Sequence, residues 1–183
     1  MFDFLKKRKK SEQSEAATEA FLKIADWISN CNPEVHGVLV YCLDEQMAYR
    51  TQYADRYQLR GIDVNTCDAD TLCWIAIVDE LEASGDCVEV DHAVELEDFL
   101  CVVSQLNAAK QLDLSSLHLE ESGDVYQWCG DCNQYLQKND MLFCGIDIDS
   151  DGIDLILVTT AEYDKISALA QQAGHRIVPA ETL

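Results

Sequence analysis

Apolar positions recur with helical spacing through the N-terminal part of the chain. Phe21, Ile24 and Ile28 form one stripe, which ends before Pro33. The segment 34–61 keeps a roughly helical spacing of apolar residues and ends at a glycine, so it predicts mostly helix. The pattern therefore opens the chain with helices.

The middle of the chain predicts two more helices with one strand between them. A helix is expected over residues 70–83 with Asp70 as its N-cap, and residues 87–90 alternate as a short strand. An amphipathic helix follows, because five apolar residues recur at helical spacing: Leu96, Phe99, Leu100, Val103 and Leu106.

The C-terminal third has the clearest pattern. It predicts helix, strand, strand, capped helix and short strand over residues 125–138, 141–149, 153–160, 161–173 and 175–178. We expect a single α+β domain over residues 17–183, with mostly helices packed on a small sheet and a C-terminal helix–strand–hairpin–helix–strand unit. Residues 1–16 are expected to be a flexible tail, basic and then polar.

The stretch GIDIDSDGID, residues 145–154, contains the turn of the predicted hairpin. A two-residue Asp-Gly turn would place Ile148 opposite Leu155 and Asp149 opposite Asp154. One face of the hairpin would then be apolar and the other acidic. Because facing like charges are destabilising, a cation, an arginine or the basic tail would be needed to compensate them.

A divalent-cation site is one hypothesis for this acidic face. Its candidate ligands are Asp147, Asp149, Asp151 and Asp154. An EF-hand is excluded, because position 12 of such a loop would be Val158 rather than glutamate and a strand precedes the loop. Calcium or magnesium, structural or hydrolytic, is the one cofactor that the spacing leaves open.

Charge distinguishes this chain more than any motif does. It carries 34 acidic and 13 basic residues, a net charge of -21, and five of the cations lie within residues 1–10 beside one acid. The remainder therefore has an excess of 25 acids, which repels nucleic acid and attracts basic proteins. The basic tail predicts at most weak membrane contact, and no apolar run is long enough for stable insertion.

Nine cysteines lie mostly inside apolar runs, with no secretory signal before them, which predicts reduced thiols in a cytoplasmic protein. Cys129 and Cys132, in WCGDC, resemble the thioredoxin active-site pentapeptide. No buried strand precedes that motif, however, so an apolar helix face explains both residues more simply. A zinc site would need a second ligand pair, which the sequence lacks.

Two further sets of polar residues qualify as candidates. Asp91 and His92 follow a strand, but neighbours in sequence point apart, so a surface histidine with Asp91 capping the next helix is favoured over an acid–base pair. Arg50, Arg56 and Arg60 alternate with tyrosines, and in so acidic a chain they are expected to pair with acids.

Three stretches in the C-terminal two-thirds carry a family resemblance: VEVDHAVELEDFL, WCGDCNQYL, and GIDIDSDGIDLILV with the helix EYDKISALAQQAG after it. Together they resemble a bacterial family known only as a domain of unknown function, over about residues 50–178. The resemblance implies a cytosolic setting and an α+β fold. It implies no activity, so no catalytic residue is transferred.

Two functional hypotheses follow. The first is an acidic, cytosolic, non-enzymatic module that binds a basic protein partner, as toxin-neutralising immunity proteins do. The alternative is a divalent-cation or hydrolytic site at the aspartate-rich hairpin. No assembled catalytic constellation is visible in the sequence, which argues against an enzyme.

Overall fold

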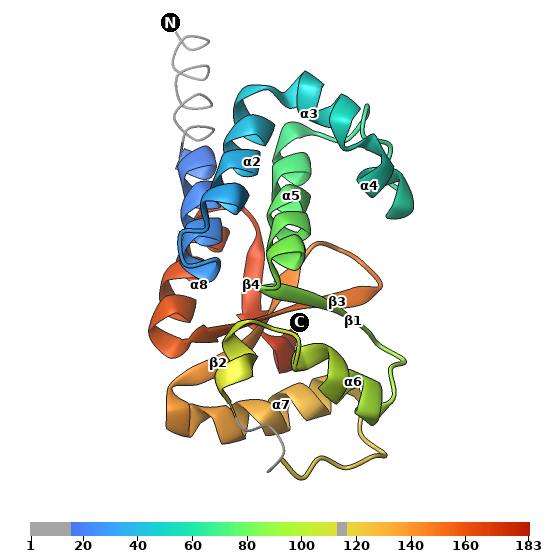
Figure 1. Ribbon diagram of the computed structural model, residues 1–183, viewed down its shortest axis with the longest axis vertical. Helices are drawn as coiled ribbons and strands as arrows, with labels where there is room; N and C mark the ends of the chain where they lie inside the picture. The colour runs from blue at the N-terminus through green and yellow to red at the C-terminus, as the bar shows by residue number, and fades with distance from the viewer. Residues whose placement is uncertain (1–15, 113–116) are drawn as a thin grey trace, which may run out of the picture.

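A four-stranded antiparallel sheet lies at the centre of the molecule, with helices on both of its faces (Figure 1). The computed structural model describes residues 16–112 and 117–183. The strand order is β1-β3-β2-β4, with bounds β1 Cys87–Asp91, β2 Met141–Asp147, β3 Gly152–Thr159 and β4 Arg176–Pro179. The predicted α+β class is confirmed, whereas the predicted tail lies almost entirely outside the described residues.

The helices fall close to their predicted ranges. Residues 16–28 are helical. The others are α2 Pro33–Asp44, α3 Gln46–Gln52, α4 Ala54–Leu59, α5 Ala69–Ser84, α6 Leu96–Val103, α7 Val125–Leu136 and α8 Thr160–Ala173. Short 3-10 turns occupy Ala108–Gln111 (η1), Gln137–Asn139 (η3) and Ala180–Thr182 (η4).

Capping residues explain two of the helix boundaries. Thr159 and Glu162 form the predicted capping box at the start of α8. The N-cap of α5 is Asp68 rather than the predicted Asp70, because the Asp68 carboxylate accepts the backbone N–H groups of Asp70 and Thr71.

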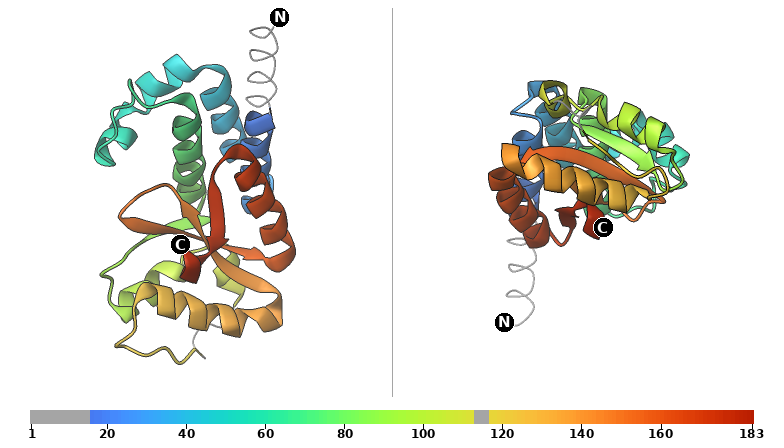
Figure 2. Two further views of the ribbon diagram at one scale, coloured as in Figure 1. Left: turned by 180° about the vertical axis from the view of Figure 1, so that it is seen from behind. Right: turned by 90° about the horizontal axis from the view of Figure 1, so that it is seen from below.

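Each face of the sheet has its own hydrophobic core. Figure 2 shows the helices that cover the two faces. The helix 16–28, α2, α5 and α8 cover one face, which we call the α5 face, with Ile24, Leu39, Trp74 and Ile166 among its core residues. The other, the α7 face, is covered by α6, α7 and the short turns η1 and η4, with Phe99, Trp128, Leu136 and Ala180 in its core. The sheet therefore has no broad solvent-exposed face.

The predicted register of the hairpin is wrong. Ile146 pairs with Asp154, and Met141 pairs with Thr159, so the two strands are joined by a longer loop centred on Ser150 rather than by a two-residue turn. Asp149 consequently does not face Asp154. Asp149 instead lies in the loop with a left-handed φ of 59° and donates its N–H to the Asp147 side chain.

Candidate functional site

A pocket of about 880 Å³ opens on the α5 face, between α4, α5, the strand β1 and the β2–β3 loop. In Figure 1 and in the left view of Figure 2, α4 lies above this loop, at the end of the segment formed by α3 and α4. The acidic lining residues are Asp79, Glu82, Glu89, Asp149 and Asp151, and we call the space the acidic pocket. Its apolar lining includes Leu59, Ile62, Ile75 and Ile148.

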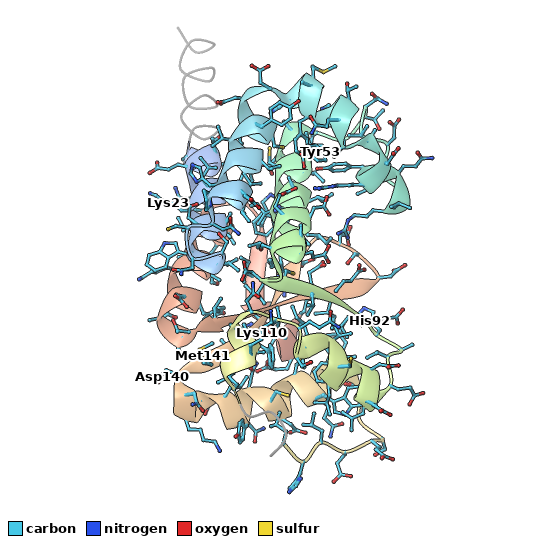
Figure 3. The ribbon with its side chains drawn as sticks, in the orientation of Figure 1. Lys23, Tyr53, His92, Lys110, Asp140 and Met141 are labelled. Atoms are coloured by element: carbon cyan, nitrogen blue, oxygen red, sulfur yellow. The ribbon has the colours of Figure 1, made fainter. Side chains whose placement is uncertain are left out.

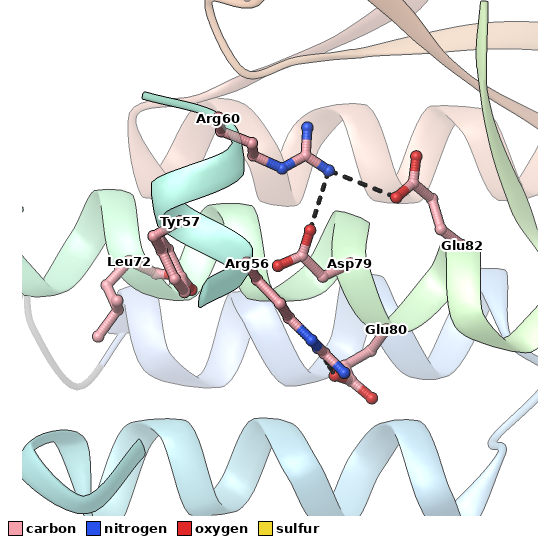
Figure 4. Close-up of polar contacts among 7 residues, drawn as sticks. All are labelled: Arg56, Tyr57, Arg60, Leu72, Asp79, Glu80 and Glu82. Carbon is pink, nitrogen blue, oxygen red and sulfur yellow. Dashed lines mark hydrogen bonds and ion pairs between the residues drawn. The ribbon is translucent and has the colours of Figure 1, made fainter. Parts of the chain in front are cut away.

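The two arginines that line the acidic pocket are already engaged. Arg60 contacts Asp79 at 2.9 Å and Glu82 at 3.3 Å, and Arg56 pairs with Glu80 (Figure 4). These pairs have a structural cause, because α5 is buried over a continuous run of its residues and brings Asp79 and Glu80 into the interior with it. Buried carboxylates require counterions, and Arg56 and Arg60 supply them.

These contacts confirm the expected pairing of Arg56 and Arg60 with acids. Arg50 differs, because its guanidinium donates to the backbone carbonyls of Val64 and Cys67 instead. It fixes the segment before α5 and takes no part in the pocket.

Asp154 is the most unusual group beside the pocket. Its side chain is fully buried on β3, and neither carboxylate oxygen has a hydrogen-bond partner among the described residues. Asp79 has one such oxygen as well, on the side of its carboxylate that Arg60 does not contact. Buried polar groups in proteins are nearly always hydrogen-bonded, so a carboxylate with two orphan oxygens calls for an explanation.

The strand pairing shows where Asp154 points. Directly paired residues in an antiparallel sheet project to the same face, and Asp154 pairs with Glu89, which lines the acidic pocket. The pKa of Asp154 is raised to about 7, mainly by burial and also by the nearby carboxylates of Glu82 and Glu89, against the lowering effect of Arg60. Burial also raises the pKa of Glu82, against the opposing effect of Arg60.

The four hairpin aspartates do not come together as the metal hypothesis needs. Alternation along the paired strands sends Asp147 to the α7 face and Asp154 to the α5 face, and Asp147 instead binds Arg176 at 2.9 Å. Asp149 and Asp151 line the acidic pocket. Within residues 16–112 and 117–183, no three His, Cys, Asp or Glu side chains are placed to hold a metal ion.

Cys129 and Cys132 are buried on α7 within the core of the α7 face. Burial raises the pKa of both thiols, that of Cys132 to about 12, so neither forms a thiolate near neutral pH. The apolar-face interpretation of WCGDC explains this placement. All nine cysteines are free thiols, and all lie within the described residues.

Asp91 and His92 lie exposed at the end of β1, with His92 at the periphery of the molecule (Figure 3). The Asp91 carboxylate accepts the N–H of Ala93 at 2.7 Å, and the His92 ring stacks on Tyr126 at 5.5 Å. Asp91 thus stabilises the turn rather than capping α6, whose N-cap is Glu95. Neither of these contacts joins Asp91 to the ring of His92.

Most of the acidic pocket was missed in the sequence. The sequence pattern points to Arg56, Arg60 and the loop aspartates. It does not point to Asp79, Glu82 or Glu89. The available signal is an acid inside an otherwise apolar run, as at Asp79 in WIAIVDEL and at Asp154 in IDLILV. Such acids are expensive to bury, so they mark either an internal ion pair or a binding site.

Fold and site together define a two-core α+β domain with an acidic pocket whose carboxylates outnumber their counterions. Residues 20–180 match the model of a family described as a domain of unknown function, DUF6630, and the chain belongs to this family. No curated protein and no solved structure matches the chain.

None of the helices within residues 16–112 and 117–183 combines the length and the apolar character that crossing a bilayer requires.

Proposed function

We propose that this chain is an acidic protein-binding module that engages a basic protein partner through the acidic pocket. The observation that carries the proposal is the charge imbalance there: Glu89, Asp149 and Asp151 have no ion-pair partner among the described residues, while Arg56 and Arg60 are occupied. Leu59, on the pocket's rim, is 89% exposed and offers an apolar contact that a bare ion would not use.

The proposal also includes a setting. Nine free thiols are compatible with a reducing bacterial cytosol, where an immunity-like role would consist of neutralising a basic toxin. The net charge of -21 would steer such a partner to the domain and make association faster at low salt.

The experiment is an affinity capture with the full chain, followed by purification of the retained protein. We expect a partner with a basic surface, released as salt rises, and lost when Glu89→Gln and Asp151→Asn are combined with Leu59→Ala. The matched control is Glu120→Gln with Glu121→Gln, two exposed acids that lie outside the pocket. Equal retention by both sets of variants, or retention that ignores salt, would contradict the proposal.

The alternative proposal remains a divalent cation, for which Asp149 and Asp151 are the available hairpin ligands. Calorimetric titration with calcium and with magnesium tests it directly. A saturable heat that disappears in the Asp149→Asn and Asp151→Asn double variant would favour the cation over the protein partner.

A further inference from the structure

We infer that the acidic pocket is a receptor for one cationic head group on an apolar stem, a guanidinium or an ammonium, and that Asp154 is the carboxylate it neutralises. The inference deepens the proposed function and rests on it for one point, namely that the stem is an arginine or lysine side chain of the partner protein.

The first support is the buried carboxylate itself. Asp154 is fully buried, and neither of its oxygens has a hydrogen-bond partner among the described residues, whereas the buried amide of Asn133 makes three hydrogen bonds. An orphan carboxylate is among the costliest groups to place in a protein interior. A positive charge held in the pocket, beside the Glu82 and Glu89 carboxylates that raise the pKa of Asp154, lowers the cost of ionising it.

The second support is that Gly152 on β3 leaves room for a second acid, Glu89 of the neighbouring strand β1. Glu89 pairs with Asp154 across β1 and β3, and its carboxylate lies over Gly152. A Cβ atom at Gly152 would lie only 2.8 Å from the Glu89 carboxylate oxygen. The absence of a side chain at Gly152 therefore lets Glu89 lie on the sheet, on the same face as Asp154.

The third support is that residues 16–112 and 117–183 offer no free cation for this position. Arg60 is the nearest candidate, yet its guanidinium is held by Asp79 and Glu82. It opposes the raised pKa of Asp154 through its charge but donates no hydrogen bond to it. The missing counterion must therefore come from outside the described part of the chain.

The lining explains why the ligand has a stem. Leu59, Ile62, Ile75 and Ile148 give the pocket apolar walls beside its carboxylates. A metal ion would gain nothing from such walls and would need a ligand cluster that the described residues do not provide. The aliphatic part of arginine or lysine fits them, because both side chains place a hydrocarbon stem behind the charged head.

Proton release accompanies binding in this arrangement. The charged and titratable groups around Asp154 are Arg60 after α4, Asp79 and Glu82 from α5, and Glu89 and Cys87 from β1. The ligand's positive charge stabilises the carboxylate, so the Asp154 proton leaves to solvent as the head group enters. Affinity therefore increases as pH rises through about 7.

The test is a nuclear magnetic resonance titration of the full chain with N-acetyl-arginine methylamide and N-acetyl-lysine methylamide at pH 8. We expect saturable shifts of the amide signals of Leu59 and Gly152, and binding at least about 10-fold weaker for the neutral isostere N-acetyl-citrulline methylamide. Between pH 6 and pH 8 the affinity should rise roughly 10-fold. Calorimetry in buffers of different ionisation enthalpy should detect the released proton.

Variants assign the effect to the pocket. Asp154→Asn should weaken binding by about 10-fold and abolish its pH dependence. Glu89→Gln, at an exposed position that does not threaten folding, should also weaken binding and decides the matter if Asp154→Asn does not fold. Asp91→Asn, exposed at the end of the same strand, should change nothing.

Several results would overturn the inference: no shift with either cationic probe, equal binding of the citrulline probe, or wild-type affinity in both Asp154→Asn and Glu89→Gln. Tighter binding of free cadaverine than of the lysine probe would support the cationic site and overturn the side-chain source. If the probes do not bind but the chain still captures a partner in a salt-sensitive way, only the inferred cation site is refuted. If the probes bind but no partner is captured, only the proposed function is refuted.

Discussion

The two faces of the sheet treat a buried polar side chain in opposite ways. On the α7 face, the amide of Asn133 accepts the N–H of Phe143 at 2.6 Å and donates to the Phe143 carbonyl at 3.0 Å and to Glu181 at 2.7 Å. On the α5 face, Asp154 is equally inaccessible, and its carboxylate accepts no hydrogen bond from any residue that the structure describes.

This difference separates structure from function. Asn133 fills the hydrogen-bonding needs of a strand edge and ties α7 to β2, so its polarity stabilises the fold. Asp154 stabilises nothing that the structure shows, and burial holds its pKa near 7 instead of near its usual value. The cationic head group proposed above would account for a residue that costs stability in the free protein.

The largest expected effect on stability concerns Asn133, the hydrogen-bonded polar residue of the α7 face. Asn133→Ala leaves both backbone groups of Phe143 buried without partners, so the free energy of unfolding should fall by about 4 kcal/mol. Urea denaturation measures it. The control is Gln134→Ala, an exposed neighbour on α7, with a change below about 0.5 kcal/mol. Equal effects of the two substitutions would remove the contrast between the faces.

The next prediction concerns the pH dependence of stability. In the folded chain Asp154 keeps its proton up to about pH 7, whereas in the unfolded chain it loses its proton near the ordinary aspartate pKa of 3.8. Folding is therefore progressively opposed as pH rises through this window, and the full cost applies above about pH 7.

The stability of Asp154→Asn relative to wild type should consequently grow by roughly 3 kcal/mol between pH 4 and pH 8. Denaturation of both proteins at the two pH values gives this number, and Asp91→Asn should show no comparable growth. A difference between Asp154→Asn and wild type that stays constant with pH would mean that Asp154 titrates normally.

A smaller effect is expected for the engaged cation of the pocket. Arg60→Gln removes the counterion shared by Asp79 and Glu82, and the guanidinium is mostly buried, so unfolding should become easier by about 2 kcal/mol. Lys23→Gln breaks the exposed pair with Glu19 and should cost only about 0.3 kcal/mol. Thermal unfolding compares the two, and similar losses would show that Arg60 is dispensable for packing.

The smallest effect is chemical rather than energetic. With iodoacetamide at pH 8, the exposed Cys31 and Cys101 should be alkylated while Cys129 and Cys132 stay unmodified in the folded protein. Mass spectrometry of the peptides identifies the labelled sites, and the same reaction in denaturant should label all nine cysteines. Fast labelling of Cys129 in the native state would revive thiol chemistry on α7.

Much of the fold could be predicted because local patterns cause it. The apolar spacing of residues 96–106, the Thr159–Glu162 capping box and the glycine after α8 are interactions between near neighbours, and all appear close to where they were expected. Small errors remain where two acids compete for one role, as with Asp68 and Asp70 at the start of α5.

The hairpin register shows why the rest could not be predicted. The expected register assumed one apolar and one exposed face, but β3 is buried from Ile153 to Val158 because helices cover both sides of the sheet. When the side chains on both faces of a strand are apolar, a one-residue shift of the strand pairing disturbs the hydrophobic pattern only a little. The alternation of side chains therefore does not determine which residues pair. The error placed Asp154 on an outer, acidic face.

The sequence by itself determined the acidity, the class of fold, and nearly every helix and strand, because charge adds along the chain and secondary structure depends on neighbours. Only the tertiary structure decided that Asp79, Glu82 and Glu89 line one pocket beside the buried Asp154, while Asp147 pairs with Arg176. The four acids Asp79, Glu82, Glu89 and Asp154 come from three separate elements, α5, β1 and β3. The burial that raises the pKa of Asp154 exists only after α5 has packed across β1 and β3.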